Sequence, residues 1–289
     1  MSRNLRGLSA RRDLTDSLYE RVAGISGNDE NFRREILGAI AGEFMTGDAA
    51  VLSAGSFYDF LQPAHSGKKV YMCDGTACLT SGRGEAVRRS LLEIYSKDEI
   101  GTMTCLGHCH SNDAFLVNGE IRKCGNGSDQ SPMKIGSNAD MPALLTPTGE
   151  ITGYYSLAEK WITRTDDALR EIEASGLRGR GGAGFPFHVK VRSSRDAPAD
   201  RKYVVCNGDE GDPGAFSDKW LLEERPHTVL FGMMMTAFIT GADTGVIYIR
   251  GEYPLAVNRV RKAVKEIEKA GIATGTEGNP FTRFRFHVV

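Results

Sequence analysis

The chain has 289 residues with nearly equal numbers of basic and acidic side chains, 36 and 37, which give a formal net charge of −1 at pH 7. This length allows two domains with a core each, and the balanced charge argues against nucleic acid or anionic lipid as a general partner. No apolar run is long enough to span a bilayer, the longest candidate being 228–242, and no apolar signal segment follows the basic N-terminus, so we expect a cytoplasmic protein.

Residues from about 13 to 60 are predicted to form a small helical bundle. Apolar side chains repeat at i, i+3 and i+4 in 18–25 and again in 32–45, which is the spacing of a helix with one buried face. We expect these helices to support the fold and to carry no chemistry.

A small α/β unit is predicted next. The segment 68–73 has the pattern of a strand ending at Cys73, and 100–105 has that of a second strand. The segment 84–96 between them predicts a helix whose inward side chains are Val87, Leu91, Leu92 and Ile94.

A hairpin and a linker end this first part of the chain. The segment 114–124 predicts a hairpin, because Asn118-Gly119 can adopt the positive φ angles of a type I′ turn. Residues 126–157 are rich in Gly, Ser, Asn and Pro and show little periodicity. They predict a linker that separates a domain at 1–125 from a second domain at 158–289.

The second domain is predicted to be a layered α/β fold with a parallel sheet. Its first helix, 164–176, has Thr165 as the expected N-cap and Gly176 as the residue that closes it. Strand and helix patterns then alternate over 201–207, 244–251, 254–271 and 283–289.

Two cysteine pairs form the first candidate site. Cys73 and Cys78 are spaced C-x4-C after one strand, and Cys105 and Cys109 are spaced C-x3-C after the next. Four converging thiolates suit a [2Fe–2S] cluster, a [4Fe–4S] cluster or structural zinc. Zinc ribbons usually use tighter C-x2-C spacing, so zinc is the less favoured alternative, beside the alternative of separate buried cysteines.

Other candidate ligands are weaker. His108 and His110 flank Cys109, but four cysteines already complete a cluster, so a histidine ligand is a minor alternative. Cys206 ends an apolar strand and Cys124 ends the predicted hairpin, and we expect both to be core thiols.

The stretches SFYDFLQ, VYMCDGTAC and CLGHCHSNDAFLVNGE resemble the thioredoxin-like [2Fe–2S] subunit of respiratory NADH dehydrogenase (complex I) and its hydrogenase relatives. The resemblance covers about Phe32 to Cys124. It implies that a [2Fe–2S] cluster is bound by Cys73, Cys78, Cys105 and Cys109.

A glycine motif is the second candidate site. Gly179, Gly181 and Gly184 have the spacing G-x-G-x-x-G, which in a Rossmann fold follows a strand and opens a helix. Here the motif follows a predicted helix, and Pro186 is expected to interrupt regular structure after it. No Gly-Lys-Ser/Thr follows either, so the motif is neither a Rossmann turn nor a P-loop.

The motif still has the composition of a ligand loop. With few side chains, its backbone N–H groups can approach a flat or anionic ligand, Arg178 and Arg180 add charge for phosphate, and Phe185 offers a stacking face. The loop NGDEGDPG, 207–214, places three carboxylates just after a buried strand, where α/β proteins bind ligands. Such carboxylates can accept from ribose or flavin groups and repel a 2′-phosphate, which favours NADH over NADPH.

The stretches GLRGRGGAGFP and YVVCNGDEGDPGAFSDK resemble the NADH- and FMN-binding flavoprotein subunit of complex I, NAD-reducing hydrogenases, electron-bifurcating hydrogenases and formate dehydrogenases. The match runs from about Ser156 to Val289. The resemblance implies that FMN and NAD(H) are bound by Gly179, Arg180, Gly181, Gly182, Ala183, Gly184, Phe185, Lys190, Asn207, Asp209, Glu210 and Asp212. Phe185 is expected to stack on adenine, Lys190 to meet the FMN phosphate or ribityl chain, and Asp212 to lie near the nicotinamide.

The sequence also departs from this family. Phe187-His188 stands where relatives have Thr-Gly, and Asp212 and Gly208 stand where respiratory relatives tend to have Glu and Ala. A second flavin motif, G-x-Y-x-C-G-E-E, and a later cysteine-rich segment are absent from these 289 residues. We therefore expect an incomplete FMN site that another chain or a continuation completes.

The leading hypothesis is an enzyme subunit, a diaphorase in which NADH passes a hydride to FMN and electrons leave singly through iron–sulfur clusters. Its partners are expected to be further iron–sulfur subunits of a hydrogenase, formate dehydrogenase or complex I-like assembly. The alternatives are a non-catalytic [2Fe–2S] electron carrier whose flavin site needs another chain, and a zinc-stabilised nucleotide-binding module.

Overall fold

The structure is a computed structural model that describes residues 18–23, 25, 30–57, 65–124, 135–136, 138, 153, 161, 164–272 and 284–289. The chain divides into two compact units, Met1–Asp129 and Gln130–Val289, and each is described by itself. The predicted linker at 126–157 lies almost entirely outside the described residues.

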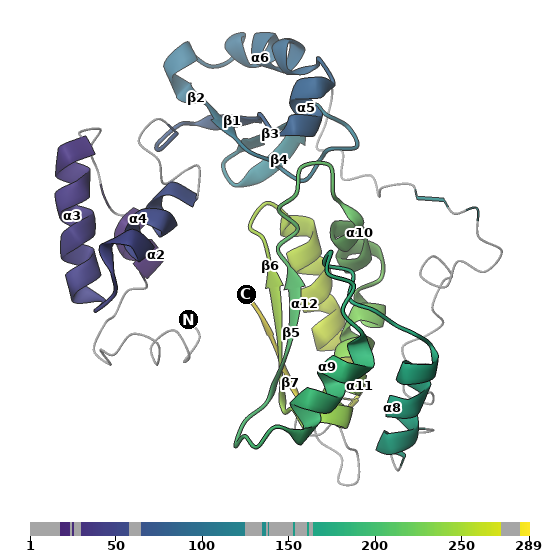
Figure 1. Ribbon diagram of the computed structural model, residues 1–289. Helices are drawn as coiled ribbons and strands as arrows, with labels where there is room; N and C mark the ends of the chain where they lie inside the picture. The colour runs from purple at the N-terminus through teal and green to yellow at the C-terminus, as the bar shows by residue number, and fades with distance from the viewer. Residues whose placement is uncertain are drawn as a thin grey trace. The chain divides into compact units, whose positions relative to one another are not determined.

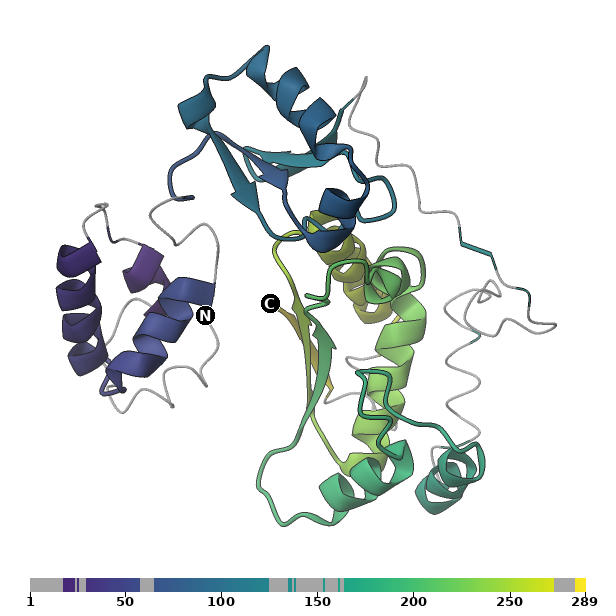
Figure 2. The same cartoon turned by 45° about the horizontal axis from the view of Figure 1, so that its top comes forward.

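The described residues of the N-terminal part of the first unit form the helices α2 (Leu18–Ala23), α3 (Glu30–Glu43) and α4 (Asp48–Phe57) (Figure 2). They share an apolar core formed by Val22, Leu37, Ile40, Ala41 and Val51. The helical bundle that the sequence predicts for this region is confirmed for the described residues.

A four-stranded mixed sheet forms the rest of the first unit, in the order β2-β1-β3-β4. Its strands are β1 (Val70–Cys73), β2 (Ile100–Met103), β3 (Ala114–Val117) and β4 (Glu120–Lys123). β1 and β2 are parallel, whereas β1–β3 and β3–β4 are antiparallel. The connections contain α5 (Thr76–Thr80), α6 (Gly84–Leu92) and the 3-10 turn η2 (Lys97–Glu99).

The predicted hairpin is confirmed, but the predicted buried face of α6 is partly wrong. Asn118 and Gly119 have φ angles of 51° and 75°, as a type I′ turn requires. On α6, Val87 and Leu91 are buried, whereas Leu92 and Ile94 are 44% and 73% exposed. Leu92 is the last residue of α6 and, directly after Leu91, points away from the buried face of the helix. Ile94 lies beyond the end of the helix.

The second unit is built on a fully parallel sheet of three strands in the order β5-β6-β7 (Figure 1), which confirms the predicted parallel α/β layer. The strands are β5 (Tyr203–Gly208), β6 (Thr244–Ile249) and β7 (Arg285–Val288). The helices are α8 (Thr165–Ala174), α9 (Phe187–Asp196), α10 (Ser217–Glu224), α11 (Pro226–Thr240) and α12 (Pro254–Lys269).

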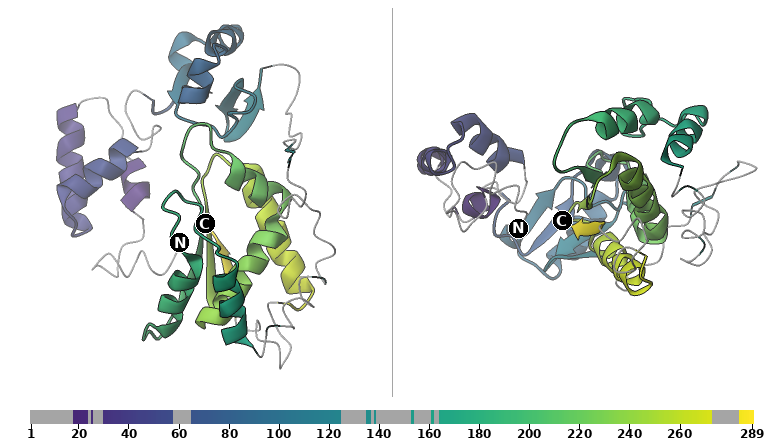
Figure 3. Two further views of the ribbon diagram at one scale, coloured as in Figure 1. Left: turned by 45° about the vertical axis from the view of Figure 1, so that its right-hand side comes forward. Right: turned by 90° about the horizontal axis from the view of Figure 1, so that it is seen from below.

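One face of this sheet packs on helices (Figure 3), with a core drawn mainly from α11, α12 and β6. Helices α8 and α9 pack on α11 through a smaller cluster of Ala168, Leu169, Val191 and Ile239. The opposite face of the sheet carries Tyr203, Val205 and Tyr248, all exposed. Among the described residues, no helix is long and apolar enough to cross a membrane.

The structure corrects two details around α8 and α9. Thr165 is the first residue of α8 and not its N-cap, a position that Arg164 takes without a side-chain capping bond. Gly176 ends α8 with a φ of 65°, as predicted. Pro186 does not interrupt structure but is the N-cap of α9, because proline is tolerated where a helix begins.

Candidate functional site

The two cysteine pairs lie at the same edge of the first unit's sheet. Cys73 ends β1 and Cys78 follows on α5, while Cys105 and Cys109 follow β2. Because β1 and β2 are parallel neighbours, their carboxyl ends meet, and the N–H of Asp74 donates to the carbonyl of Met103 at 3.2 Å. Strand direction therefore brings together the pairs that the sequence predicted to converge.

The other three cysteines lie close enough to Cys78 to affect its thiol. The Sγ atoms of Cys105 and Cys109 lie 3.6 Å apart. Burial raises the pKa of the Cys78 thiol to about 12, helped by a hydrogen bond with Cys73 and by the nearby Cys109 and Cys105. Two thiolates on one tetrahedral metal ion, with metal–sulfur bonds of about 2.3 Å, would be roughly 3.7 Å apart. The Cys105–Cys109 separation fits shared coordination of one ion.

The backbone around these cysteines is shaped for close packing. Cys105 has a φ of 57°, an uncommon conformation for a residue other than glycine, and it is only 1% exposed. A Cβ added to Gly75 would lie 3.2 Å from the backbone nitrogen of Cys105, a tight contact, so glycine there eases the close approach of the two loops. The hydroxyl of Thr104 donates to Asp74 Oδ1 at 3.0 Å and also joins the loops, a contact that the sequence analysis missed.

The remaining Cys and His side chains have other surroundings. Cys124 and Cys206 are partly buried beside apolar side chains, and burial raises the pKa of each thiol, that of Cys206 to about 11. The rings of His108 and His110 lie against one another, with centroids 5.4 Å apart. Within the described residues, no group of three or more His, Cys, Asp or Glu side chains forms a ready-made metal site.

The glycine motif in the second unit is a closed loop between α8 and α9. Its base is a short antiparallel bridge between Arg178 and Pro186, with the N–H of Gly179 donating to the carbonyl of Phe185 at 2.9 Å. The Arg178 guanidinium donates to the carbonyl of Gly184 at 2.9 Å, so this arginine holds the loop together. Gly182 and Gly184 have φ angles of 104° and 59°, which favour glycine.

The tip of this loop is open to a ligand. Residues 179–183 and Lys190 are exposed, and Phe185 is 53% exposed. The exposed tip therefore offers backbone N–H groups, the charge of Arg180 and an aromatic face, and Lys190 lies in the first turn of the helix that follows. A helix N-terminus preceded by such a loop favours anions such as phosphate.

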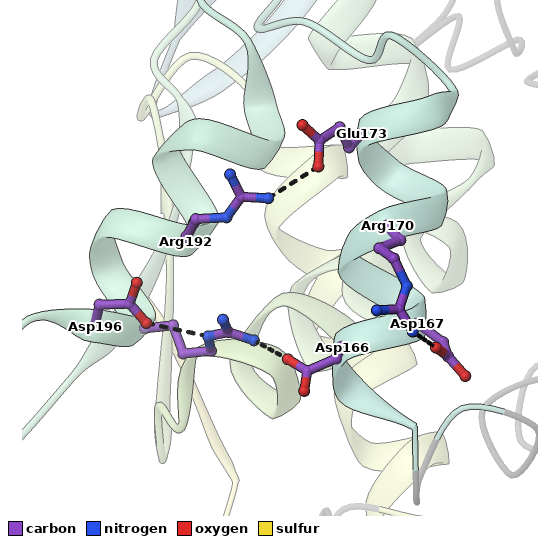
Figure 4. A network of polar contacts seen from close by, with 7 residues as sticks. Asp166, Asp167, Arg170, Glu173, Arg192 and Asp196 are labelled. Atoms are coloured by element: carbon purple, nitrogen blue, oxygen red, sulfur yellow. Dashed lines mark hydrogen bonds and ion pairs between the residues drawn. The ribbon is translucent and has the colours of Figure 1, made fainter.

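Helices α8 and α9 are joined beside the loop by ion pairs (Figure 4). Arg192 contacts Glu173 at 2.9 Å, and Arg195 contacts Asp166 at 2.6 Å, each pair running from α9 to α8. Arg195 also contacts Asp196 on its own helix. These exposed ion pairs add to the apolar packing of Val191 against α8 and α11. The ion pairs and the packing together hold α8 against α9, and so hold the two ends of the glycine loop in place.

The acidic loop 207–212 begins with the last two residues of β5, Asn207 and Gly208, and continues beyond the carboxyl end of the strand. The Asn207 side chain accepts from the N–H of Asp209 at 3.0 Å, which turns the chain away from the strand. Asp209 and Asp212 are exposed. Gly208 is packed so closely that an added Cβ would lie 2.9 Å from Leu222 Cδ1 and 3.0 Å from the carbonyl oxygen of Tyr248.

The Glu210 carboxylate is turned toward the protein. Oε1 accepts from the Ser217 hydroxyl and from the N–H of Asp218 at 3.2 and 3.0 Å, and Oε2 accepts from the N–H of Lys219 at 3.1 Å. Glu210 therefore caps the N-terminus of α10. This is a different contact from the flavin hydrogen bond expected for its side chain.

Residues after β6 adjoin this loop, and the sequence analysis missed them. Arg250 donates to the main-chain carbonyl of Glu210 at 2.6 Å and to Glu252 Oε2 at 3.1 Å, and the Tyr253 hydroxyl donates to Glu210 Oε2 at 3.1 Å. The signal that the sequence offered for these residues is the charged pair Arg250 and Glu252, which directly follows the apolar strand β6. The carboxyl ends of β5 and β6 therefore form one polar edge of the sheet. Helix α11 contacts β5, and it also contacts α8 and α9.

Comparison with known proteins agrees with this geometry. Residues 172–288 match the family model of the Nuo51 FMN-binding domain. The matched segment includes the whole glycine loop, the acidic loop and the parallel sheet. It begins within α8 and ends with β7.

Curated relatives cover different parts of the chain. The HndC subunit of the NADP-reducing hydrogenase of Solidesulfovibrio fructosivorans is 43% identical over 122 residues, 42% of this chain and 25% of the relative. The F 2 subunit of the NADH-quinone oxidoreductase of Rhizobium meliloti is 37% identical over 155 residues, 52% of this chain and 37% of the relative. The alpha subunit of the NAD-reducing hydrogenase HoxS of Cupriavidus necator is 29% identical over 257 residues, 75% of this chain and 42% of the relative.

This chain spans less than half the length of these three relatives. The HoxS match is too long to lie in Gln130–Val289 alone, so it also reaches into the first unit. The crystal structure of an NAD+-reducing [NiFe]-hydrogenase aligns with all of this chain and 52% of its own, with a TM-score of 0.66 and 21% identity. That likeness establishes the fold.

Proposed function

We propose that this chain is an NADH-oxidising, FMN-dependent electron-transfer subunit of the diaphorase type, which acts in a hydrogenase, formate dehydrogenase or complex I-like assembly. The observation that carries the proposal is that the Nuo51 FMN-binding match covers both loops that the structure opens to a ligand. A cytoplasmic location and partner subunits with further iron–sulfur clusters are part of the proposal.

The residues of the second unit fit a flavin and a nicotinamide nucleotide. In this proposal the backbone of Gly179 to Gly184 lies along the two ligands, with Arg180 and Lys190 toward phosphate groups and Phe185 stacked on adenine. Asn207, Asp209 and Asp212 have exposed side chains that can accept from flavin or ribose groups. Glu210 contributes by holding the acidic loop on α10, which keeps its neighbours oriented.

The chemistry that bound FMN would supply is acceptance of a hydride from NADH and release of the electrons one at a time. The protein's own part is to bind, to orient the nicotinamide against the flavin and to exclude a 2′-phosphate through its carboxylates. No side chain is assigned as an acid or base, because hydride transfer between two bound cofactors requires none.

The first unit fits a thioredoxin-like [2Fe–2S] domain. Cys73, Cys78, Cys105 and Cys109 supply four thiols at one sheet edge, and a Cys105–Cys109 separation of 3.6 Å suits coordination of one iron by two thiols. Binding requires deprotonated thiols, so cluster assembly would displace the proton that burial holds on Cys78. The HoxS match, which extends into this unit, supports a fusion of the two modules.

The experiment that tests the enzyme is a visible spectrum of the anaerobically purified protein with its co-purifying partners, before and after addition of NADH. We expect flavin and iron–sulfur bands that bleach with NADH and less with NADPH at equal concentration. Iron–sulfur bands that ignore both nucleotides would support the alternative of an electron-carrying subunit. A colourless protein that binds zinc would contradict both.

The cluster assignment is tested by serine variants. Cys78→Ser is expected to lose the visible iron–sulfur bands and most iron and acid-labile sulfide. The matched control, Cys124→Ser, lies in the same unit and should retain them. Equal loss in the two variants, or no loss in Cys78→Ser, would overturn the ligand set.

A further inference from the structure

One donor to the Glu210 carboxylate comes from a different part of the fold than the other three, from the same turn whose Arg250 donates to the Glu210 main-chain carbonyl. Three of its hydrogen bonds come from the start of α10, which directly follows the acidic loop. The fourth comes from the Tyr253 hydroxyl, beyond the end of β6 and 43 positions along the chain. This bond connects the Glu210 side chain to β6 and α12.

The position of the Tyr253 ring is fixed on every side. The residue is 0% exposed. Its N–H donates to the carbonyl of Arg250 at 3.1 Å, and the residue is the N-cap of α12, directly before Pro254. The Lys219 ammonium and the Arg250 guanidinium lie over its ring, 5.5 and 5.3 Å from the centroid.

Several buried charges surround this tyrosine. Lys219, Glu223 and Arg250 are 4%, 7% and 8% exposed, and burial of charge is costly unless each charge is paired. Lys219 lies 4.0 Å from Glu223, and Arg250 pairs with Glu252. Each of these ion pairs lies within one element, and the contacts that join α10 and Glu210 to the turn after β6 are the Lys219 ammonium over the Tyr253 ring, the Tyr253 hydroxyl bond to Glu210 and the Arg250 bond to the Glu210 carbonyl.

We propose that Tyr253 is a positioning residue for the nucleotide loop 207–212. Its hydroxyl, acting through Glu210, holds the loop in its ligand-ready shape before any ligand arrives, so that binding does not carry the entropic cost of ordering it. The inference rests on the proposed function only for the identity of the ligand, FMN. Its structural part, the ordering of the loop, stands on the contacts of Tyr253.

The test uses Tyr253→Phe in the full chain, purified with its partners, and Tyr203→Phe as the matched control. Tyr203 lies at the opposite end of β5, on the exposed sheet face. Amide hydrogen exchange is measured without flavin, and the Kd of added FMN is measured by fluorescence quenching. We expect Tyr253→Phe to speed exchange of the 207–212 amides and to raise the FMN Kd, each by about tenfold, which is the loss of one hydrogen bond to a charged acceptor.

A double-mutant cycle separates positioning from general destabilisation. Glu210→Gln is expected to speed loop exchange similarly, and the double variant should add less than the two single effects together, because both remove the same contact. Acceleration across all of α12 and β5, in proportion to lost stability, would overturn the proposal. So would a loop that exchanges as it does in Tyr203→Phe.

Failure of the proposed function gives a different result. A wild-type protein that binds no FMN would refute the ligand, while the exchange comparison would still decide whether Tyr253 orders the loop.

Discussion

The Thr104 hydroxyl donates a hydrogen bond to Asp74 Oδ1 at 3.0 Å, and this bond joins the loop of Cys73 and Cys78 to the loop of Cys105 and Cys109. The two residues directly follow β1 and β2. A side-chain bond in this position limits how far the two loops can separate when a metal centre forms or is lost.

Thr104→Val is therefore expected to weaken retention of the proposed [2Fe–2S] cluster, because valine keeps the shape of threonine and loses the donor. Loss of a hydrogen bond to a charged acceptor costs about 1.5–3 kcal/mol at most, so iron loss on exposure to a chelator should accelerate several-fold. Iron content and visible absorption over time measure it. Thr80→Val is the control, since its hydroxyl bonds only to carbonyls of α5, and equal rates in both variants would contradict the prediction.

Gly208→Ala is expected to destabilise the second unit. The new Cβ would meet the Tyr248 carbonyl oxygen at 3.0 Å and Leu222 at 2.9 Å, and the backbone atom cannot give way without bending β6. We expect a loss of about 1–3 kcal/mol in the free energy of unfolding, measured with urea. Gly232→Ala on α11, which meets nothing within 4 Å, should instead stabilise by about 0.5–1 kcal/mol because alanine favours a helix.

Gly182→Ala is expected to weaken ligand binding without unfolding the protein. The φ of 104° disfavours any side chain, at a cost of about 1–3 kcal/mol, but the loop tip is exposed and can relax locally. The relaxed loop would present its N–H groups differently, so the Kd for FMN should rise. Gly181→Ala is the control, because its φ is not positive and nothing lies within 4 Å of the added Cβ, and it should show a smaller rise.

The apolar contact between α8 and α9 should contribute more than their ion pairs. Val191 is 2% exposed, and Val191→Ala is expected to cost about 2 kcal/mol of unfolding free energy. Arg195→Ala removes exposed contacts to Asp166 and Asp196 and should cost less than about 1 kcal/mol. High salt should reduce only the second effect, and an Arg195 effect that equals that of Val191 would contradict this ranking.

Glu99 should titrate far below other glutamates. An ion pair with Lys69 and hydrogen bonds from Ser96 lower its pKa from 4.5 to about 2. Because the folded-state pKa is lowered, the stabilisation from Glu99 is present above about pH 4.5 and is lost as the pH falls toward 2. An NMR titration of the side-chain carboxyl measures this directly. Lys69→Met should move the pKa upward, and an unchanged value would show that Lys69 is not the cause.

Much of the fold was predictable because the decisive signals are local. The Asn118-Gly119 turn, the parallel strand pattern and the spacing of the cysteine pairs each depend on residues close together in the sequence. The convergence of Cys73 with Cys105 needed only the expectation of two adjacent strands. The two candidate ligand loops could be located from composition, since one segment is rich in glycine and the other in acidic residues, and their role in binding stays a prediction.

The wrong or missing predictions concern residues at the ends of helices and contacts between residues that are far apart in the sequence. The exposure of Leu92 and Ile94 depends on where α6 stops, and α9 was missed because Pro186 can either break a helix or begin one. The bond between Glu210 and Tyr253 joins residues 43 positions apart. No periodicity in the sequence reports such a pair, because the contact exists only once β5 and β6 lie side by side.

The strand order β5-β6-β7 also governs how the chain reaches its native state. Each parallel neighbour is separated in sequence by a crossover of one or two helices, whereas β3 and β4 are joined by the two-residue turn Asn118-Gly119. A hairpin of the latter kind closes in about 1–10 μs, but a parallel pair must first close a long loop. The parallel pairs of the second unit are therefore expected to form later than the β3–β4 hairpin, and their strand edges stay unpaired for longer.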